Sequence, residues 1–381
     1  MIDLLTVVGA RPQFVKASAL SREFALGDWG IAERILHTGQ HADEAMSAVF
    51  FQELGMPEPV HRFVLTASGV AARLGQMMES IASVTAERRP DVMLVYGDTD
   101  STWAGAWVAA RAGIPLVHVE AGLRSGDRAM PEELNRVLTD HVADLLFCPT
   151  DGAVRHLAAE GIVHDPAGQA GRPVRVVRTG DILCDVARWA ADRVTQGPQT
   201  HVGLVTLHRP ANVDDPARLR RWMEALCGST SGRIVFPVHP RTALVLHQIW
   251  GAAWPRVLAA GGVDAVEPMG YLELAAALQG VDWVLTDSGG VQKEAFFHAK
   301  PCWVARPVTE WAELVTGGWA RLVPEPEGWR GALERDAAGF PPPGDDRWSV
   351  PLYGDGRSAR SMAQEIQQLA TSRQSGANVS E

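Results

Sequence analysis

Carboxylate side chains follow two apolar runs in the first half of the chain. Asp98 comes directly after VMLVYG, and Glu120 comes directly after PLVHV. A third carboxylate, from Glu132 or Glu133, stands in the segment MPEELNR, where a helix can begin. Like charges in one site raise the pKa of at least one member, so the pattern favours proton transfer. For one of the two neighbouring glutamates, an ordinary interaction with the helix dipole is the alternative.

The segment VVGARPQFVK has the features of an anion-binding turn. Its apolar run ends at Gly9, and Pro12 suits the first turn of a helix because proline has no amide hydrogen to satisfy. The helix N-terminus would then act together with the side chains of Arg11 and Lys16 on a negative ligand. The alternative is that Arg11 is a surface charge beside a turn. The spacing does not match GxGxxG, so it gives no support to NAD binding.

The segment VLTDSGGVQKEAFF makes the same transition from strand to turn to helix in the second half. Ser288, Gly289 and Gly290 would offer backbone amides and a hydroxyl to a phosphate, and the glycines allow close approach. Glu294 lies about one turn into the helix, where a carboxylate can accept hydrogen bonds from a ribose diol. The alternative is a capped helix after a glycine-rich turn. Because each half of the chain has such a turn, we expect a diphosphate ligand in the cleft between two domains.

Two histidines end apolar runs in the second half. His208 is followed by Arg209 in VTLHRP, and His239 ends VFPVH. A lone histidine is more often structural, but two at equivalent strand ends are expected to face one anionic ligand. His118 lies within its run and is expected to be a core histidine. Since its pairing with Glu120 lacks a third ligand, the sequence predicts no metal site.

These side chains need a scaffold that brings strand ends together. Short apolar runs alternate with amphipathic stretches at 4–9, 34–39, 91–98, 115–120 and 145–150, and again at 201–209, 233–241, 283–290 and 301–307. Such alternation predicts an α/β protein with two doubly wound parallel sheets, whose ligands bind beyond the carboxyl ends of the strands. We expect domains at 1–183 and 184–356, a final helix at 357–372 and a disordered tail at 373–381. The Trp-rich segments DWVL and WRGAL are expected to serve packing.

Length and composition exclude several classes of protein. The 381 residues exceed what one hydrophobic core usually spans, in agreement with two domains. A net charge of -10 disfavours nucleic acid as the main partner. The apolar runs are too short for a membrane span, and MIDLLTVVGARP lacks the basic region of a signal peptide, so we expect a cytoplasmic protein. The four cysteines form no CxxC pair, which favours reduced thiols over disulfides or zinc ligands.

Taken together, the motifs resemble those of the bacterial UDP-N-acetylglucosamine 2-epimerases of the non-hydrolysing type. The resemblance covers nearly the full length and rests on GARPQFVK, HTGQH, GDTDST, HVEAGLRSGDRAMPEELNR, TGD, LHRPANVDD, FPVHPRT, GY, TDSGGVQKEA and YGDG. So many motifs in one order make the resemblance specific. It implies an isomerase of the GT-B fold, in which two Rossmann-like domains hold a UDP-sugar in the cleft between them, without a cofactor or a metal. It also implies a homodimer.

The resemblance assigns roles to residues of the matched motifs. It places sugar chemistry in the first domain and UDP binding mainly in the second, and the final helix would cross back to the first domain. The catalytic positions are Asp98, Glu120, Glu132 and His208. The positions for substrate and UDP binding are Arg11, Lys16, Gln40, Arg136, Arg209, His239, Tyr271, Ser288, Gly289, Gly290 and Glu294.

The chemistry of the implied reaction agrees with several acids in one site. The C2 proton of an N-acetylhexosamine is not beside a carbonyl, so no carboxylate removes it at a useful rate from the intact sugar. As UDP leaves, positive charge at C1 acidifies that proton, and cations and helix amides stabilise the leaving diphosphate. A 2-acetamidoglucal and UDP would remain bound, and readdition with protonation from the opposite face would invert C2. Two acid-base groups are therefore required, and the sequence leaves open which of Asp98, Glu120 and Glu132 performs which step.

Two departures from the family pattern bear on substrate and regulation. In PVTEWAELV, Trp311 stands where many members carry Arg, a form that resembles relatives acting on UDP-2,3-diacetamido-2,3-dideoxyglucuronate. The segment TASGVAARLGQ lacks the Arg-Gln pair of the regulatory site in some members, so allosteric activation is not carried over. The sequence therefore predicts interconversion of UDP-N-acetylglucosamine and UDP-N-acetylmannosamine in polysaccharide biosynthesis, with the diacetamido-uronate as the alternative. The motifs also leave open a hydrolysing relative that releases N-acetylmannosamine and UDP, a GT-B glycosyltransferase and a non-catalytic UDP-sugar sensor.

Overall fold

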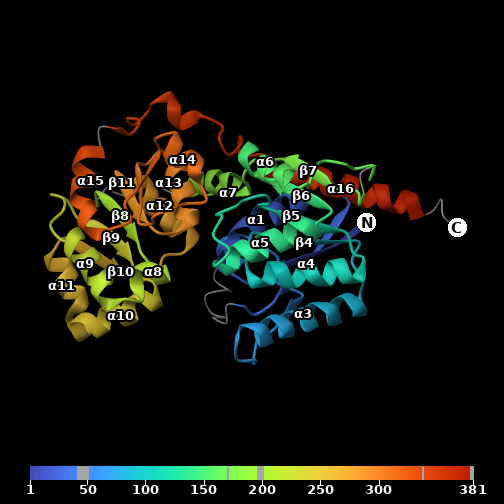
Figure 1. Ribbon diagram of the computed structural model, residues 1–381, viewed down its shortest axis with the longest axis horizontal. Coiled ribbons are helices and arrows are strands. Elements are labelled where there is room, and N and C mark those ends of the chain that lie inside the picture. The colour runs from blue at the N-terminus through green and yellow to red at the C-terminus, as the bar shows by residue number, and fades with distance from the viewer. Residues whose placement is uncertain (41–50, 170, 195–200, 337–338, 378–381) are drawn as a thin grey trace. The chain divides into compact units, whose positions relative to one another are not determined.

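The computed structural model describes residues 1–40, 51–169, 171–194, 201–336 and 339–377 (Figure 1). The chain forms two compact units: unit 1 consists of Met1–Val186 and Pro351–Glu381, and unit 2 consists of Ala187–Val350. The sequence placed these divisions after residue 183 and after residue 356. His41 of the motif HTGQH lies outside the described residues.

Within the described part of unit 1, the strands form one parallel sheet in the order β3-β2-β1-β4-β5-β6-β7. The order reverses between β1 and β4, which is the position where sheets of this type bind ligands. Its strands are β1 (Ile2–Val8), β2 (Ile31–His37), β3 (His61–Arg62), β4 (Val92–Tyr96), β5 (Leu116–Val119), β6 (Leu145–Cys148) and β7 (Arg175–Arg178).

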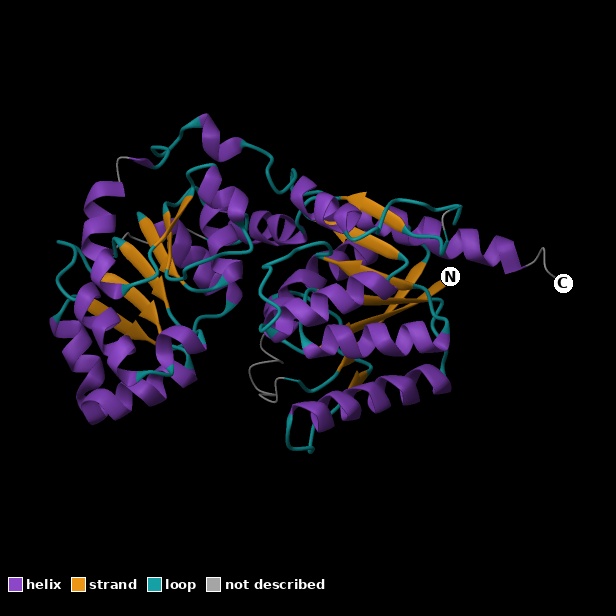
Figure 2. Cartoon of the chain, in the orientation of Figure 1, coloured by secondary structure: helices purple, strands orange, loops and turns teal. Residues whose placement is uncertain are grey.

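Helices lie on both sides of the strands of unit 1 (Figure 2), which is why every residue of β4, β5 and β6 is buried. The helices are α1 (Arg11–Leu26), α3 (Val70–Glu87), α4 (Asp100–Ala112), α5 (Pro131–Val142), α6 (Asp151–Ala159) and α16 (Ser358–Ala377). Helix α7 (Ile182–Ala191) begins in unit 1 and continues into unit 2, because the division falls after Val186. Local sequence sets their ends. Thr99 caps α4 by accepting a hydrogen bond from the Thr102 amide at 3.4 Å, and Gly113 ends α4 in a left-handed conformation, φ 64°.

The described part of unit 2 repeats this architecture with the parallel order β10-β9-β8-β11-β12-β13. Its strands are β8 (Gly203–Thr206), β9 (Ile234–Pro237), β10 (Val263–Val266), β11 (Trp283–Thr286), β12 (Cys302–Val304) and β13 (Ala320–Leu322). Its α-helices are α8 (Pro210–Val213), α9 (Pro216–Leu226), α10 (Pro240–Trp250), α11 (Trp254–Ala260), α12 (Tyr271–Gly280), α13 (Gly289–Phe297), α14 (Ala312–Thr316) and α15 (Trp329–Asp336). Short 3-10 helices are η1 (Gly251–Ala253), η2 (Pro326–Gly328) and η4 (Asp346–Ser349). The two parallel sheets with their helices confirm the predicted α/β class.

Indole rings fill the core of unit 2. Trp303 contacts Trp283 edge-on, with ring centroids 6.3 Å apart, and Trp329 at 5.6 Å. Trp303 and Trp329 are fully buried beside Trp222. The expectation that the Trp-rich segments serve packing is therefore confirmed.

The last helix, α16, belongs to unit 1. Asp185 accepts hydrogen bonds from the amides of Ser358 and Ala359 at its start, at 3.1 and 2.8 Å, and Gln367 donates to the Trp29 carbonyl at 2.8 Å. The helix continues to Ala377, so the predicted helix end at residue 372 was wrong, and residues 373–377 are helical instead of part of the tail. The physical reason is that polar residues such as those in SRQSGA do not end a helix that is already anchored by packing. Residues 378–381 of the predicted tail lie outside the described part. No helix in the described ranges combines the length and apolar character of a membrane span.

Candidate active site

The acids predicted in unit 1 lie at neighbouring strand ends. Strands β4 and β5 pair in parallel, with Tyr96 opposite Val119. Asp98 follows β4 by two residues and Glu120 directly follows β5, so both stand at the carboxyl edge of the sheet. Helix α1 starts at the same edge, one strand away, and carries Lys16 in its second turn.

Glu120 is held in an unusual backbone conformation. Its φ of 72° lies in the left-handed region, which is costly for a residue with a side chain. Hydrogen bonds of neighbouring residues explain how it persists: the Gly97 amide donates to the Val119 carbonyl at 2.9 Å, and the Ala121 amide donates to the Phe147 carbonyl at 3.0 Å. Such backbone strain is concentrated at functional sites.

An ion pair joins the Glu120 carboxylate to the Lys16 ammonium. The two side chains are only 9% and 13% exposed, so the pair is weakly screened by water. The ammonium favours the ionised form of the carboxylate, which is the form that a base needs. Lys16 therefore lies beside a candidate acid-base group and not only in an anion-binding turn.

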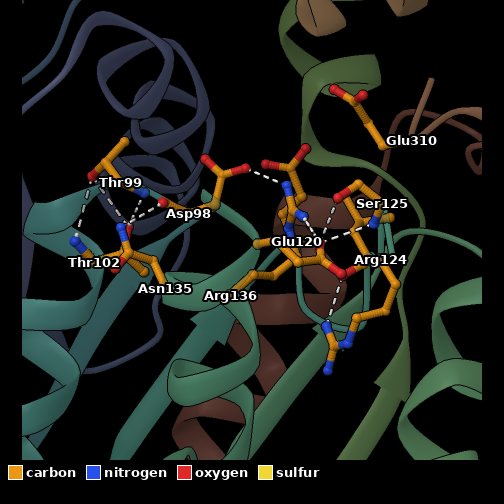
Figure 3. A network of polar contacts seen from close by, with 12 residues as sticks. Asp98, Thr99, Thr102, Glu120, Arg124, Ser125, Asn135, Arg136 and Glu310 are labelled. Atoms are coloured by element: carbon orange, nitrogen blue, oxygen red, sulfur yellow. Dashed lines mark hydrogen bonds and ion pairs between the residues drawn. The ribbon is translucent and has the colours of Figure 1, made fainter. Parts of the chain in front are cut away.

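Asp98 is paired with the Arg136 guanidinium from α5 (Figure 3). The other side of that guanidinium binds Glu133 at 2.7 Å. Asn135 donates to the Asp98 carbonyl at 3.2 Å and to Asp100 Oδ1 at 3.0 Å. Helix α5 thus positions the turn that carries Asp98.

The structure separates the roles of the two neighbouring glutamates. Glu133 is buried and accepts from the amides of Ser125 and Gly126 at 2.9 and 3.0 Å. Burial acts to raise the pKa of Glu133, but these hydrogen bonds and the Arg136 charge outweigh it and lower the pKa. Glu133 therefore holds the loop between β5 and α5. Glu132, which is half-buried in the first turn of α5, stays the candidate for chemistry.

Some residues of this edge were missed at the sequence level. Gln13 is buried, accepts from the amides of Gly9 and Ala10 at 2.8 and 3.1 Å, and donates to the Tyr96 carbonyl at 3.0 Å. It therefore joins the ends of β1 and β4. The signal was present in the sequence, since a glutamine three residues into a helix forms a capping box.

Gln40, predicted to bind substrate, has a protein partner in this structure. Its Oε1 accepts from the amide and the hydroxyl of Ser101 at 3.0 and 2.6 Å, at the start of α4. Arg11 begins α1 and is half-buried. Both residues stand at the carboxyl edge of the sheet, as the sequence predicted.

In unit 2, the predicted histidines lie close together. The rings of His208, after β8, and His239, after β9, have centroids 5.8 Å apart. His239 also caps α10, because its Nδ1 accepts from the Arg241 amide at 3.2 Å. The turn of His208 and Arg209 is held by Asp287, a fully buried carboxylate that accepts from both backbone amides at 3.0 to 3.1 Å. Asp287 was missed, although it stands next to Ser288 in the quoted motif.

The start of α13 has the expected glycine turn. Ser288 precedes the helix, and a side chain at Gly289 would place its Cβ 2.4 Å from a Glu310 carboxylate oxygen, so the Glu310 side chain would have to move. At Gly290 an added Cβ would meet no atom closer than 4.0 Å. The open backbone at Gly290 suits the approach of a ligand.

Glu294 has two aromatic neighbours. The Tyr271 hydroxyl donates to its Oε1 at 2.6 Å, and His298 Nε2 lies 4.0 Å from its Oε2. Burial lowers the pKa of His298 to about 4, so this ring is neutral at pH 7. Tyr271, only 6% exposed, thus positions Glu294 and offers little surface of its own.

Lys293 and Trp311 form a second pair beside α13. The Lys293 ammonium lies 3.9 Å from the centre of the Trp311 ring, and both side chains are buried. A cation over an indole face is favourable, more so when desolvated. In the described part of the chain, no group of three or more His, Cys, Asp or Glu residues is arranged to hold a metal ion.

Comparisons with known proteins agree with this arrangement. Residues 27–367 match the family described as UDP-N-acetylglucosamine 2-epimerase. A UDP-2,3-diacetamido-2,3-dideoxy-D-glucuronate 2-epimerase of Pseudomonas aeruginosa is 40% identical over 97% of this chain and 100% of its own length. A UDP-N-acetylglucosamine 2-epimerase of Methanocaldococcus jannaschii is 36% identical over 84% of this chain and 88% of its own. The crystal structure of the Methanocaldococcus jannaschii enzyme with UDP-GlcNAc and UDP superposes with a TM-score of 0.83, at 32% identity, over 96% of this chain and 100% of that one.

Proposed function

The chain belongs to the UDP-N-acetylglucosamine 2-epimerase family and is a UDP-sugar 2-epimerase of the GT-B-like fold, and on that premise we propose how its residues divide the reaction. Unit 2 binds UDP, and unit 1 carries the groups that move the C2 proton. The observation that carries the proposal is the pair of ion-paired carboxylates, Asp98 and Glu120, at adjacent strand ends of one sheet. A protein that only bound UDP-sugars would have no use for two such acids.

The proposed UDP site uses the strand ends of unit 2. The amides of Gly289 and Gly290 at the start of α13, together with Ser288, would bind the diphosphate, since a helix N-terminus favours an anion. His208, Arg209 and His239 would contribute further donors. Glu294, positioned by Tyr271, would accept hydrogen bonds from the ribose hydroxyls. Arg11, Lys16, Gln40 and Arg136 of unit 1 complete the proposed set of binding residues.

The proposed chemistry is elimination followed by readdition. Donors around the diphosphate stabilise UDP as the C1–O bond breaks, and the developing charge at C1 acidifies the C2 proton. A carboxylate of the set Asp98, Glu120 and Glu132 takes this proton, and another protonates C2 of the 2-acetamidoglucal from the opposite face. Lys16 favours the ionised form of Glu120, which is the form that accepts a proton, and Arg136 pairs with Asp98. His208 is proposed to be the catalytic histidine that donates to UDP as it leaves.

Two sugars are candidates for the substrate. UDP-N-acetylglucosamine, which would give UDP-N-acetylmannosamine, is bound in the Methanocaldococcus jannaschii structure. The diacetamido-glucuronate derivative is named for the Pseudomonas aeruginosa relative, which is 40% identical over 97% of this chain. The buried pair of Lys293 with Trp311 favours this second candidate, because Trp311 is the residue that sets the Thr-Glu-Trp form apart.

The test of the proposal is proton NMR of the purified enzyme with each UDP-sugar in deuterated water. We expect the C2 epimer to form with deuterium at C2 for one or both sugars, because the glucal takes its new proton from solvent. Glu120→Gln should abolish this incorporation and leave the affinity for UDP unchanged. Glu224→Gln is the matched control, since it removes an exposed carboxylate of α9 that is paired with Arg220 at 3.2 Å.

Each remaining outcome has a defined meaning. Free N-acetylmannosamine and UDP would show that water captures the intermediate, as in a hydrolysing enzyme. Turnover without deuterium at C2 would contradict elimination and readdition. Bound UDP without turnover of either sugar would favour a transferase or a sensor, and full activity of Glu120→Gln would remove Glu120 from the mechanism.

The assembly and cellular setting belong to the same proposal. We propose a cytoplasmic homodimer that serves polysaccharide biosynthesis. The four cysteines all lie in the described part of the chain and are thiols there, which suits a reducing compartment. A groove beside α3, lined by alanines, Met78 and the exposed Trp107 together with the polar Gln76 and Glu79, is the surface we propose for the second copy. Sedimentation of the wild type and of Trp107→Glu tests this, with a monomeric wild type as the contradicting result.

A further inference from the structure

His118, expected to be a simple core histidine, lies between two hydrogen-bond acceptors. It is fully buried in β5. Its Nε2 is 2.8 Å from the Gly97 carbonyl oxygen, and its Nδ1 is 2.7 Å from Asp140 Oδ1. A carbonyl oxygen only accepts, so Nε2 carries a proton. Gly97 is the residue directly before Asp98, so this contact reaches the turn of the first candidate acid.

Asp140 extends the contact to the second acid. Its Oδ2 accepts from the Gly122 amide at 3.1 Å and from Arg124 Nη1 at 2.7 Å. Gly122 follows Glu120 by two residues, and it has a φ of 77° next to the left-handed Glu120. The Asp140 side chain is therefore bound at once to the ring of His118 and to the loop that leaves β5.

The groups around Asp140 favour its ionised form. Burial acts to raise the pKa of Asp140, but the hydrogen bonds and charges of His118 and Arg124 outweigh it and lower the pKa. Glu160 pairs with the far side of Arg124 at 2.7 Å, and the thiol of Cys148 is kept neutral because burial and the charge of Asp140 raise its pKa. The 2.7 Å contact of Nδ1 with Asp140 Oδ1 and the 2.8 Å contact of Nε2 with the Gly97 carbonyl therefore hold the ring from both nitrogens.

We propose that His118 is a positioning residue: its buried ring links Asp140 to the Gly97 carbonyl and thereby fixes, relative to each other, the two loops that carry Asp98 and Glu120. The inference rests on the proposed roles of these two acids. Neither His118 nor Asp140 would touch the substrate. A displacement of about 1 Å at a catalytic group can cost about 100-fold in rate, so a link between the two loops has a catalytic consequence.

The first test measures the ring protons directly. In long-range proton–nitrogen NMR spectra of protein labelled at the histidine ring nitrogens, we expect Nε2 of His118 to carry a proton that exchanges slowly, because it donates to the buried Gly97 carbonyl. Asp140→Asn should keep this proton, and Asp140→Leu should speed its exchange, because the ring then loses the partner of Nδ1. A wild-type His118 without a proton on Nε2 would overturn the proposal, whatever the enzyme activity.

The second test separates position from charge. Asp140→Asn keeps the hydrogen bonds of the link, and we expect its kcat to stay within about tenfold of the wild type. Asp140→Leu removes them, and we expect a kcat about 100-fold lower with the affinity for UDP unchanged. Asp144→Leu is the matched control: Asp144 accepts from the Leu116 amide at 2.8 Å, at the opposite end of β5.

The outcomes that contradict the proposal are clear. The proposal is overturned if Asp140→Leu keeps the wild-type kcat, or if Asp140→Leu and Asp140→Asn lose kcat equally. It is also overturned if the control Asp144→Leu loses as much kcat as Asp140→Leu. If Asp140→Leu does not fold, the ring-proton spectra of the wild type still decide. An inactive wild type would refute the proposed function, and the same spectra would still test the link.

Discussion

The left-handed backbone of Glu120 leads to a prediction about the relative stability of two inactive variants. Replacing Glu120 by Gln or by Gly removes the carboxylate and its ion pair with Lys16 in both variants. The two variants differ in the backbone cost at φ 72°. A side chain in that region costs roughly 1–2 kcal/mol, and glycine costs roughly 0.5–1 kcal/mol through the entropy of the unfolded chain. We therefore expect Glu120→Gly to be more stable than Glu120→Gln by about 0.5–1 kcal/mol.

Urea unfolding followed by circular dichroism measures this difference, with epimerase activity absent in both variants. The control is Glu224, an exposed residue inside α9, where the same two substitutions should show the opposite order. There glycine lacks the helix propensity of glutamine and should be less stable by about 1 kcal/mol. If Glu120→Gly is the less stable variant by a similar amount, the backbone of residue 120 is not strained and the reasoning fails.

Three further predictions concern single side chains. Asp287→Ala leaves the amides of the His208 turn without their acceptor, so the free energy of unfolding in urea should fall by about 2–4 kcal/mol. Tyr271→Phe removes the 2.6 Å hydrogen bond to Glu294, and calorimetry should show UDP binding about tenfold weaker at unchanged kcat. Burial raises the pKa of Asp185 from 3.8 to about 6 despite its two amide donors, so its protonated form favours the fold. The stabilisation by protonated Asp185 is complete below pH 4 and is lost as the pH rises through 6. Over that range, the free energy of unfolding of the wild type should fall by up to about 3 kcal/mol relative to that of Asp185→Asn.

Much of the fold could be predicted because the signals are local. The inner strands β4, β5 and β6 are nearly continuous apolar runs, since helices cover both faces of the sheet there. The turns after β1 and β11 carry proline or glycine at positions where the backbone needs them. The end of α16 was missed, because packing of its earlier turns sustains a helix whose last residues have no strong helical signal.

The candidate site was predicted at the level of which residues stand at strand ends. The ion pairs were not predicted, because Lys16 and Glu120 are 104 residues apart and Arg136 and Asp98 are 38 apart. Glu132 and Glu133 are neighbours of the same type, and only the orientation of α5 makes one of them a buried acceptor for the loop of Ser125. The same holds for Gln13 and Asp287, whose partners come from other strands.

The sequence by itself determined the chemical inventory: the order of strands and helices, the acids after β4 and β5, and the anion-binding turn before α13. These follow from patterns within about ten residues, which a linear reading captures. The tertiary structure decided how these groups act on one another. It placed His118 between Gly97 and Asp140, paired Asp98 and Glu120 each with a cation and held Glu120 in a left-handed conformation. Hydrogen bonds and charge pairs depend on distances of a few ångströms between strands, and those distances exist only after the sheet has formed.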